Sequence, residues 1–229
     1  MKKFIRTIRN IFTIEELRDR ILNTLGYIII FRLGSFVVLP GVDPSKLSGT
    51  SSGILGLLDT FLGGAFSNAA ILGLGIMPYI SASIVLQLLT VAVPYFQKMQ
   101  KEGESGRKKI NQITRVLTIF ICLFQSSAYI AGTIPDEAVM VDPSLFYFSS
   151  LIILTAGTVF AMWLGERITE KGIGNGISML IMIGIISRFP GAMIAEATTK
   201  GMSGALLFII ELVALFFVVM GVVALTQAT

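Results

Sequence analysis

The stretch GLGIMPYISASIVLQLL, residues 73–89, decides how the rest of the chain is read. It is apolar enough for a lipid bilayer, yet it opens with Gly73, Gly75 and Pro78. In a helix, Ile76, Ile80 and Ile84 would lie one turn apart and form a ridge along one face. Periodicity alone favours a helix packed in a protein core, and it also allows one wall of a narrow apolar constriction.

The whole chain has the composition of an integral membrane protein. Of its 229 residues, 54% are hydrophobic and 14% are charged, with a mean hydropathy of +0.81. Soluble domains carry about 25% charged residues, and a bilayer core needs about 20 apolar residues per spanning helix. We therefore expect an all-α membrane protein, a polytopic helical bundle of about six spans: 21–39, 72–93, 113–131, 145–164, 177–189 and 205–225.

Lysine and arginine are distributed unevenly between the loops. Fourteen lie before the first span, between the second and third, or between the fourth and fifth, whereas the opposite side has only Lys46, Arg188 and Lys200. The positive-inside rule then places the N-terminus in the cytoplasm. Residues 1–20 are expected to form an amphipathic segment at the membrane surface, and the basic loops favour anionic lipid over nucleic acid as a partner.

Several kinds of chemistry are not expected. The chain has no histidine, and Cys122 is its only cysteine, so a disulfide within the chain and the usual zinc or haem ligand sets are excluded. We find no nucleophile–base pair and no paired catalytic carboxylates, so neither an enzyme nor a cofactor is expected. The glycines of GIGNG, residues 172–176, lack the dinucleotide and P-loop spacings, which favours a tight turn with a capped helix.

The segment between the first two spans predicts a re-entrant or buried half-helix. Residues 53–68 are too apolar for a solvated loop and too short to cross a bilayer. Non-helical backbone at that depth is tolerated only where protein or a water-filled cavity satisfies it, so this region is expected to face the interior. Asp59 is expected to point away from the apolar stripe, which comprises Ile54, Leu58, Phe61, Leu62 and Ala65.

A second isoleucine ridge follows in the fifth span, where Ile177, Ile181 and Ile185 lie one turn apart. Two such ridges meeting at the membrane midplane would form an apolar constriction that excludes ions by dewetting. Arg32 lies inside the first span, where a charge is costly, and it is expected to snorkel or to pair between helices.

Four motifs resemble, in order and spacing, the N-terminal half of the SecY family, the channel subunits of the Sec protein translocon. They are ELRDRILNTLGYIIIFRLGSFVVLPGVD (16–43), LGIMPYISASIVLQLL (74–89), KEGESGRKKINQITR (101–115) and MWLGERITEKGIGNGISMLI (162–181). The resemblance implies a clamshell of two inverted five-span halves, about twice the length of this chain. Residues 21–189 would then be the first half, 190–203 an external hinge loop, and 204–229 the start of the second half.

The resemblance also implies roles for particular residues. The half-helix at about 53–68 would be a plug, including Ile54, Leu58, Asp59, Phe61 and Leu62. The pore ring would include Ile80, Ile84, Ile181 and Ile185. Gln87 and Thr90 would lie on one side of a lateral gate, and the basic loop with Arg107, Lys108 and Lys109 would be a cytoplasmic contact surface.

The function that follows is a passive pore in the bacterial plasma membrane. It would pass unfolded polypeptides and release hydrophobic segments sideways, driven by a partner. The implied partners are SecE-like and SecG-like small subunits, a SecA motor ATPase or a ribosome, and polypeptides that bear signal peptides. A secondary transporter with broken helices is the alternative, and a purely structural membrane subunit is a third possibility.

Overall fold

The structure, a computed structural model, describes residues 13–47, 54–200 and 205–227, except for the side chains of residues 54, 55, 200, 205 and 206. Most of the predicted amphipathic segment 1–20 therefore lies outside the described residues.

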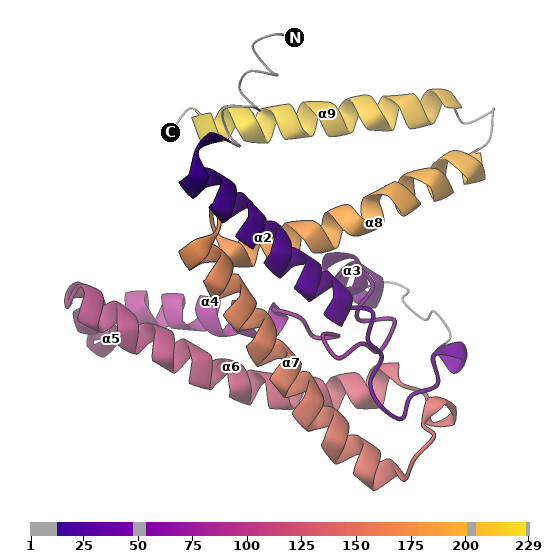
Figure 1. The fold of residues 1–229 in the computed structure, drawn as a ribbon, viewed down its shortest axis with the longest axis horizontal. Helices are drawn as coiled ribbons and strands as arrows, with labels where there is room; N and C mark the ends of the chain where they lie inside the picture. The colour runs from indigo at the N-terminus through magenta and orange to yellow at the C-terminus, as the bar shows by residue number, and fades with distance from the viewer. Residues whose placement is uncertain (1–12, 48–53, 201–204, 228–229) are drawn as a thin grey trace. The chain divides into compact units, whose positions relative to one another are not determined.

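Helices dominate the described chain (Figure 1). In order they are α2 (Glu15–Gly34), η1 (Pro44–Lys46), α3 (Ile54–Phe61), α4 (Met77–Ala92), α5 (Pro94–Lys101), α6 (Glu104–Thr133), η2 (Asp136–Ala138), α7 (Pro143–Lys171), α8 (Gly176–Lys200) and α9 (Ala205–Gln227). The chain divides into two compact units, which meet in sequence between Ile185 and Ile186, and each is described by itself.

Fewer helices qualify as spans than the sequence windows predicted. By length and composition, the described residues hold four spanning helices, α6, α7, α8 and α9, or five if the bent pair α4–α5 is one span. The pair bends by 98° at Val93, just before Pro94. The first predicted span is absent from this set because five of the first six residues of α2 are charged, and because the helix carries Arg32 and ends at Gly34, inside the apolar window.

The predicted loop at 190–203 is wrong for its first part, because α8 continues through Pro190 to Lys200. Pro190 removes one backbone donor from the helix, but the residues that follow it include three alanines, a methionine and a glutamate, all of which favour helix. The rest of that loop lies outside the described residues.

Two buried clusters organise the first unit. One surrounds the turns after α3 and joins them to α6 and α7, with Ala69, Cys122 and Leu154 fully buried. The other joins α2, α7 and the start of α8 around Phe31, Leu164 and Leu180. Helices α4 and α6 pack side by side, as do α6 and α7, and α2 packs on α7.

A row of small polar residues runs along the buried side of α6, and Cys122 within it contacts Leu154 and Thr158 of α7. Thr114, Thr118, Cys122 and Ser126 recur every four residues on α6 and are all buried. Each threonine hydroxyl donates to the carbonyl one turn back, at 2.9 Å and 2.7 Å, so no polar atom needs to face lipid. Small residues at such a seam let two membrane helices approach closely.

The irregular backbone between α3 and α4 is buried and satisfied by protein, as predicted. Leu39 donates its N–H to Ala69 O, and Ile71 donates to Val37 O, both at 2.8 Å. The Tyr129 hydroxyl of α6 donates to the Phe66 carbonyl at 2.6 Å. These bonds let a non-helical segment lie among the spanning helices.

Candidate functional site

The first turn of α4 explains the glycine and proline that open the quoted stretch. Pro78 lies where a helix has no hydrogen bond to lose. Gly75, with φ of +52°, precedes it, and a Cβ there would come within 2.5 Å of the Leu62 side chain. The chain therefore turns into α4 while leaving space for a residue from the predicted plug.

Ile80 of α4 and Ile181 of α8 line one cavity of about 210 Å³. Phe61 and Leu62, from the end of α3 and the residue after it, line the same cavity, and its other walls are Phe31, Ile76, Met77 and Leu180. Both isoleucines are half-buried and pack against the same buried cluster. Every lining side chain is apolar, so the cavity offers no side-chain ligand to an ion.

Ile84 and Ile185 lie one turn further along their helices. Their side chains are 51% and 37% exposed, respectively. The structure thus brings together Ile80 and Ile181 of the four predicted ring residues, and the place of the other two in a ring remains a prediction.

The predicted half-helix corresponds to α3, an eight-residue helix that gives way to turns at Leu62. Gly63 and Gly64 adopt φ of +62° and +92° at this break, which glycine accepts without steric cost. Leu62 is buried, whereas Phe61 is 46% exposed and lines the isoleucine cavity. The side chain of Ile54 lies outside the described residues.

Asp59, which is expected off the apolar stripe of α3, contacts Ser67 in the turns that follow the helix. It is buried, and its carboxylate accepts from the Ser67 backbone N–H at 2.9 Å and from the Ser67 hydroxyl at 3.0 Å. A buried carboxylate must be hydrogen-bonded to be tolerated. Asp59 therefore ties α3 to the turns that follow it, a contact that helical periodicity does not reveal.

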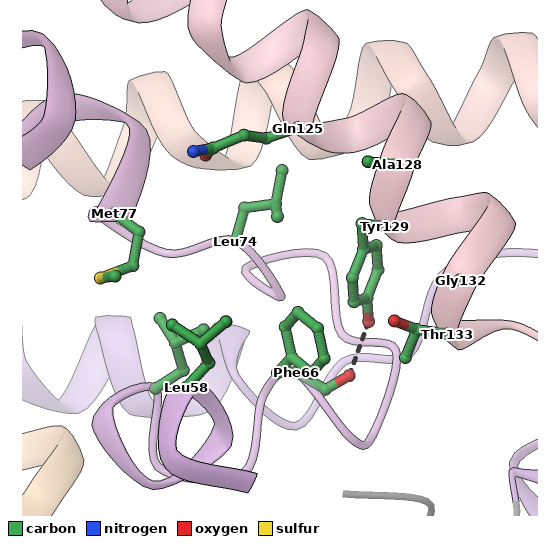
Figure 2. Close-up of a pocket in the computed structure, with 10 residues that line it drawn as sticks. Leu58, Phe66, Leu74, Met77, Gln125, Ala128, Tyr129, Gly132 and Thr133 are labelled. Atoms are coloured by element: carbon green, nitrogen blue, oxygen red, sulfur yellow. Dashed lines mark hydrogen bonds between the residues drawn. The ribbon is translucent and has the colours of Figure 1, made fainter. Parts of the chain in front are cut away.

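A second cavity of about 270 Å³ lies between α3, its following turns and α6 (Figure 2). Leu58, Phe66 and Leu74 line it from one side, and Gln125 and Tyr129 of α6 line it from the other. The Phe66 and Tyr129 rings meet edge to face, 4.7 Å between centroids, beside the hydrogen bond from the Tyr129 hydroxyl. α3 is thus separated from α6 by a mostly apolar space on this side.

Gln87 and Thr90 share a polar cavity of about 180 Å³ with residues of three helices. Thr90 is buried and donates to the Gln87 carbonyl at 2.6 Å, while the Gln87 amide donates to Ser83 at 3.3 Å. Arg107, predicted for a different role, lines the same cavity. Sequence reasoning missed the other polar lining residues, which α4, α5 and α6 bring together: Tyr79, Gln100, Asn111 and Thr114.

The predicted basic contact loop is helical rather than a loop. Arg107, Lys108 and Lys109 lie in the first turns of α6, and their side chains are exposed as expected. The chain reverses at Gly103, with φ of +72°, between α5 and α6. A Cβ on Gly106 would overlap the Met99 carbonyl, so the two helices pack directly against each other.

The GIGNG segment forms a tight turn with a capped helix, as predicted. Asn175 caps α8 by accepting from the backbone N–H groups of Ile177 and Ser178, at 3.0 Å and 3.2 Å. Thr24 of α2 accepts from the Ile173 N–H at 3.1 Å, and a Cβ on Gly176 would overlap the Gly165 carbonyl. This turn fixes the start of α8 against α2 and α7.

Arg32 pairs with the backbone between helices, which is one of the two expected outcomes. Its guanidinium donates from Nη1 to the Gly63 carbonyl at 3.4 Å and lies over the Phe36 ring, 5.4 Å from its centroid.

Comparison with known proteins gives a consistent result. The SecY family model matches residues 70–229. The protein translocase subunit SecY of Buchnera aphidicola subsp. Schizaphis graminum is 45% identical over 225 residues, covering 93% of this chain and 51% of that protein. The Escherichia coli K12 subunit is 45% identical over 209 residues, covering 86% and 46%. The chain thus spans about half the length of the curated relatives it matches.

Two solved structures share the fold. One is described as a protein conducting channel, and the other is Sec61 in a canine ribosome–channel complex from the endoplasmic reticulum. Each superposes with a TM-score of 0.57 at 19% sequence identity, covering 75% of this chain and 36% of the other. At this identity the likeness concerns the fold alone.

Proposed function

The chain belongs to the SecY family, and on that premise we propose that it supplies the plug and part of the pore ring of a protein-conducting channel. The observation that carries the proposal is the apolar cavity shared by Ile80 and Ile181 with Phe61 and Leu62. Two helices far apart in sequence and the end of the short helix α3 meet there. This is the arrangement that a shut constriction with a plug requires.

The shut constriction would block ions by steric exclusion and by dewetting. Branched apolar side chains leave no polar atom that could replace an ion's hydration shell, so ions face a high barrier at a narrow apolar constriction. An extended polypeptide would displace α3 and thread between the isoleucines, which yield without binding its sequence tightly. The energy for this movement would come from a partner, and the pore itself would be passive.

Hydrophobic segments would leave sideways next to α4. Gln87 and Thr90 would lie at this exit, where the polar cavity they share with Arg107 keeps the α4–α6 contact from being wholly apolar. Segments would pass between this side of the gate, formed by α4 and α6, and the opposing side that the family resemblance implies.

The partners and the location are proposed by likeness to the family. We place the chain in the bacterial plasma membrane with a cytoplasmic N-terminus, together with SecE-like and SecG-like small subunits and bilayer lipids, anionic ones included. The driving partner would be a SecA motor ATPase or a ribosome, and the substrates would be polypeptides with signal peptides. The exposed Arg107, Lys108 and Lys109 at the start of α6 suit contact with such a cytoplasmic partner.

The alternative of a secondary transporter requires polar or charged ligands where its substrate binds. The cavity between Ile80 and Ile181 has none among its lining residues, which are all apolar. Coupled uptake of a small solute into vesicles would be needed to favour that alternative.

Photo-crosslinking from the isoleucines tests the proposal. A photoreactive amino acid placed at Ile80 or Ile181 of the native membrane protein, with a polypeptide arrested during translocation, is expected to crosslink to that polypeptide. The control position is Ile152 on α7, which is 66% exposed and is expected to crosslink to lipid. Equal polypeptide crosslinking from all three positions, or none from Ile80 and Ile181, would contradict the proposal.

A further inference from the structure

The end of α3 is held at two points by residues that the ring and plug roles do not include. Arg32 of α2 donates from Nη1 to the Gly63 carbonyl at 3.4 Å. On the other side, Gly184 of α8 packs against the backbone of α3, since a Cβ there would overlap the Phe61 carbonyl oxygen. Gly184 lies between Ile181 and Ile185, so α3 ends directly against the second isoleucine ridge.

The backbone carbonyl groups at the end of α3 need hydrogen-bond donors. The carbonyls of Leu58, Asp59 and Thr60 accept from N–H groups just after the helix, those of Leu62, Gly64 and Gly63. The Gly63 carbonyl accepts from Arg32 instead. Because a helix C-terminus carries partial negative charge, a guanidinium beside it is favourable, and more so away from water.

The Phe36 ring helps to orient the Arg32 guanidinium for this contact. Its guanidinium lies 5.4 Å from the centroid of the Phe36 ring, a cation–π geometry. The preceding residue, Phe31, is buried and lines the same cavity as Phe61 and Leu62. The one cation within the apolar part of α2 is thus directed to the end of α3.

We propose that Arg32 and Gly184 form a latch that holds the C-terminal end of α3 against the isoleucine ridges in the shut state. The inference rests on the proposed function and adds which contacts determine the equilibrium between the shut and open states of the channel. Arg32 supplies a charge-assisted hydrogen bond, and Gly184 supplies the close approach that a larger residue would prevent. Opening requires both contacts to separate.

The test measures the release of α3 and the leak of ions separately. In a Cys122→Ala background of the native membrane protein, Ala65→Cys is labelled with a membrane-impermeant maleimide, and ion conductance is recorded in proteoliposomes; Ala65 lies in the turns just after α3 and its side chain is buried. Arg32→Gln is expected to raise the labelling rate about tenfold, as for a lost hydrogen bond to a charged group, and to raise the resting leak. Arg32→Lys keeps the cation and is expected to stay within about threefold of the parent.

Gly184→Ala tests the second contact and does not depend on the charge. It is expected to raise labelling and leak like Arg32→Gln, and the double variant is expected to raise both further, since each contact holds the end of α3 separately. The matched controls are Gly191→Ala on α8 and Gly26→Ala on α2, since a Cβ at either has no atom within 4 Å. Both controls are expected to behave as the parent.

Two outcomes distinguish failure of the latch proposal from failure of the proposed channel function. If Ile80→Ala/Ile181→Ala raises the leak while Arg32→Gln and Gly184→Ala change neither labelling nor leak, the latch is wrong and the channel stands. If the isoleucine variant also leaves the leak unchanged, the proposed function fails, and the latch with it. If Arg32→Gln does not accumulate in the membrane, Gly184→Ala decides the same question.

Discussion

Ile80 of α4 and Ile181 of α8 line the same apolar cavity, and the end of α3 closes it through Phe61 and Leu62. The helices that carry the two isoleucines are positioned by contacts at their N-terminal ends. Pro78 and the turn at Gly75 start α4, and the Asn175 cap and the Thr24 contact start α8. The position of the cavity therefore depends on how each helix begins.

Tyr129→Phe is expected to loosen the turns between α3 and α4. The Tyr129 hydroxyl is the donor to the buried Phe66 carbonyl at 2.6 Å, so its loss leaves that carbonyl without this donor, at a cost of about 1–3 kcal/mol. Hydrogen exchange of the amides between Leu62 and Leu74 should accelerate. Tyr147→Phe is the control, because the Tyr147 hydroxyl bonds to Ser127 away from these turns. Equal exchange in the parent and in Tyr129→Phe would count against this role.

Gly176→Ala is expected to prevent correct folding at the start of α8. The new Cβ would overlap the Gly165 carbonyl of α7, and backbone cannot move aside as a side chain can. We expect a severe loss of folded protein in detergent, measured by thermal aggregation. The free energy of unfolding should fall by more than about 3 kcal/mol.

Gly174→Ala in the same turn is the matched control. Gly174 has φ of +69°, but a Cβ there meets no atom within 4 Å. The cost should be the backbone strain alone, about 1–2 kcal/mol. Similar losses for both variants would mean that close packing against α7 is not what requires Gly176.

The ion pair between Arg115 and Glu166 should contribute little to stability. The guanidinium bonds to both carboxylate oxygens, at 3.0 Å and 2.7 Å, and joins α6 to α7. Because the Arg115 side chain is 51% exposed, we expect a coupling of about 0.2–1 kcal/mol that weakens in high salt. A double-mutant cycle with Arg115→Gln and Glu166→Gln, read by thermal unfolding at two salt concentrations, checks this. A coupling well above that range, unaffected by salt, would show that the pair is shielded from solvent.

Local patterns in the sequence predicted the features that depend on neighbouring residues. The helical class, the half-helix near residues 53–68, the capped GIGNG turn and the two isoleucine ridges all follow from spacing and composition. The family match and the relatives confirm the SecY resemblance. That resemblance is what led us to expect residues of both ridges in one pore ring.

Features that depend on more than the periodicity of one segment were not predictable in this way. Asp59 is buried because Ser67, across a glycine break, satisfies its carboxylate. α8 passes Pro190 because helix-favouring residues follow, although Pro and Gly together suggested a loop. The polar cavity at Gln87 needs residues from α5 and α6, and no pattern along one helix reveals them.

The most direct test of the central claim is the resting ion conductance of the native membrane protein in a planar bilayer after Ile80, Ile84, Ile181 and Ile185 are all replaced by alanine. The control replaces four isoleucines at exposed positions instead: Ile29, Ile119, Ile152 and Ile194. We predict that the first variant conducts ions several-fold more than the parent at rest and that the control does not. An unchanged resting conductance in the first variant would contradict the seal, as would an equal rise in both.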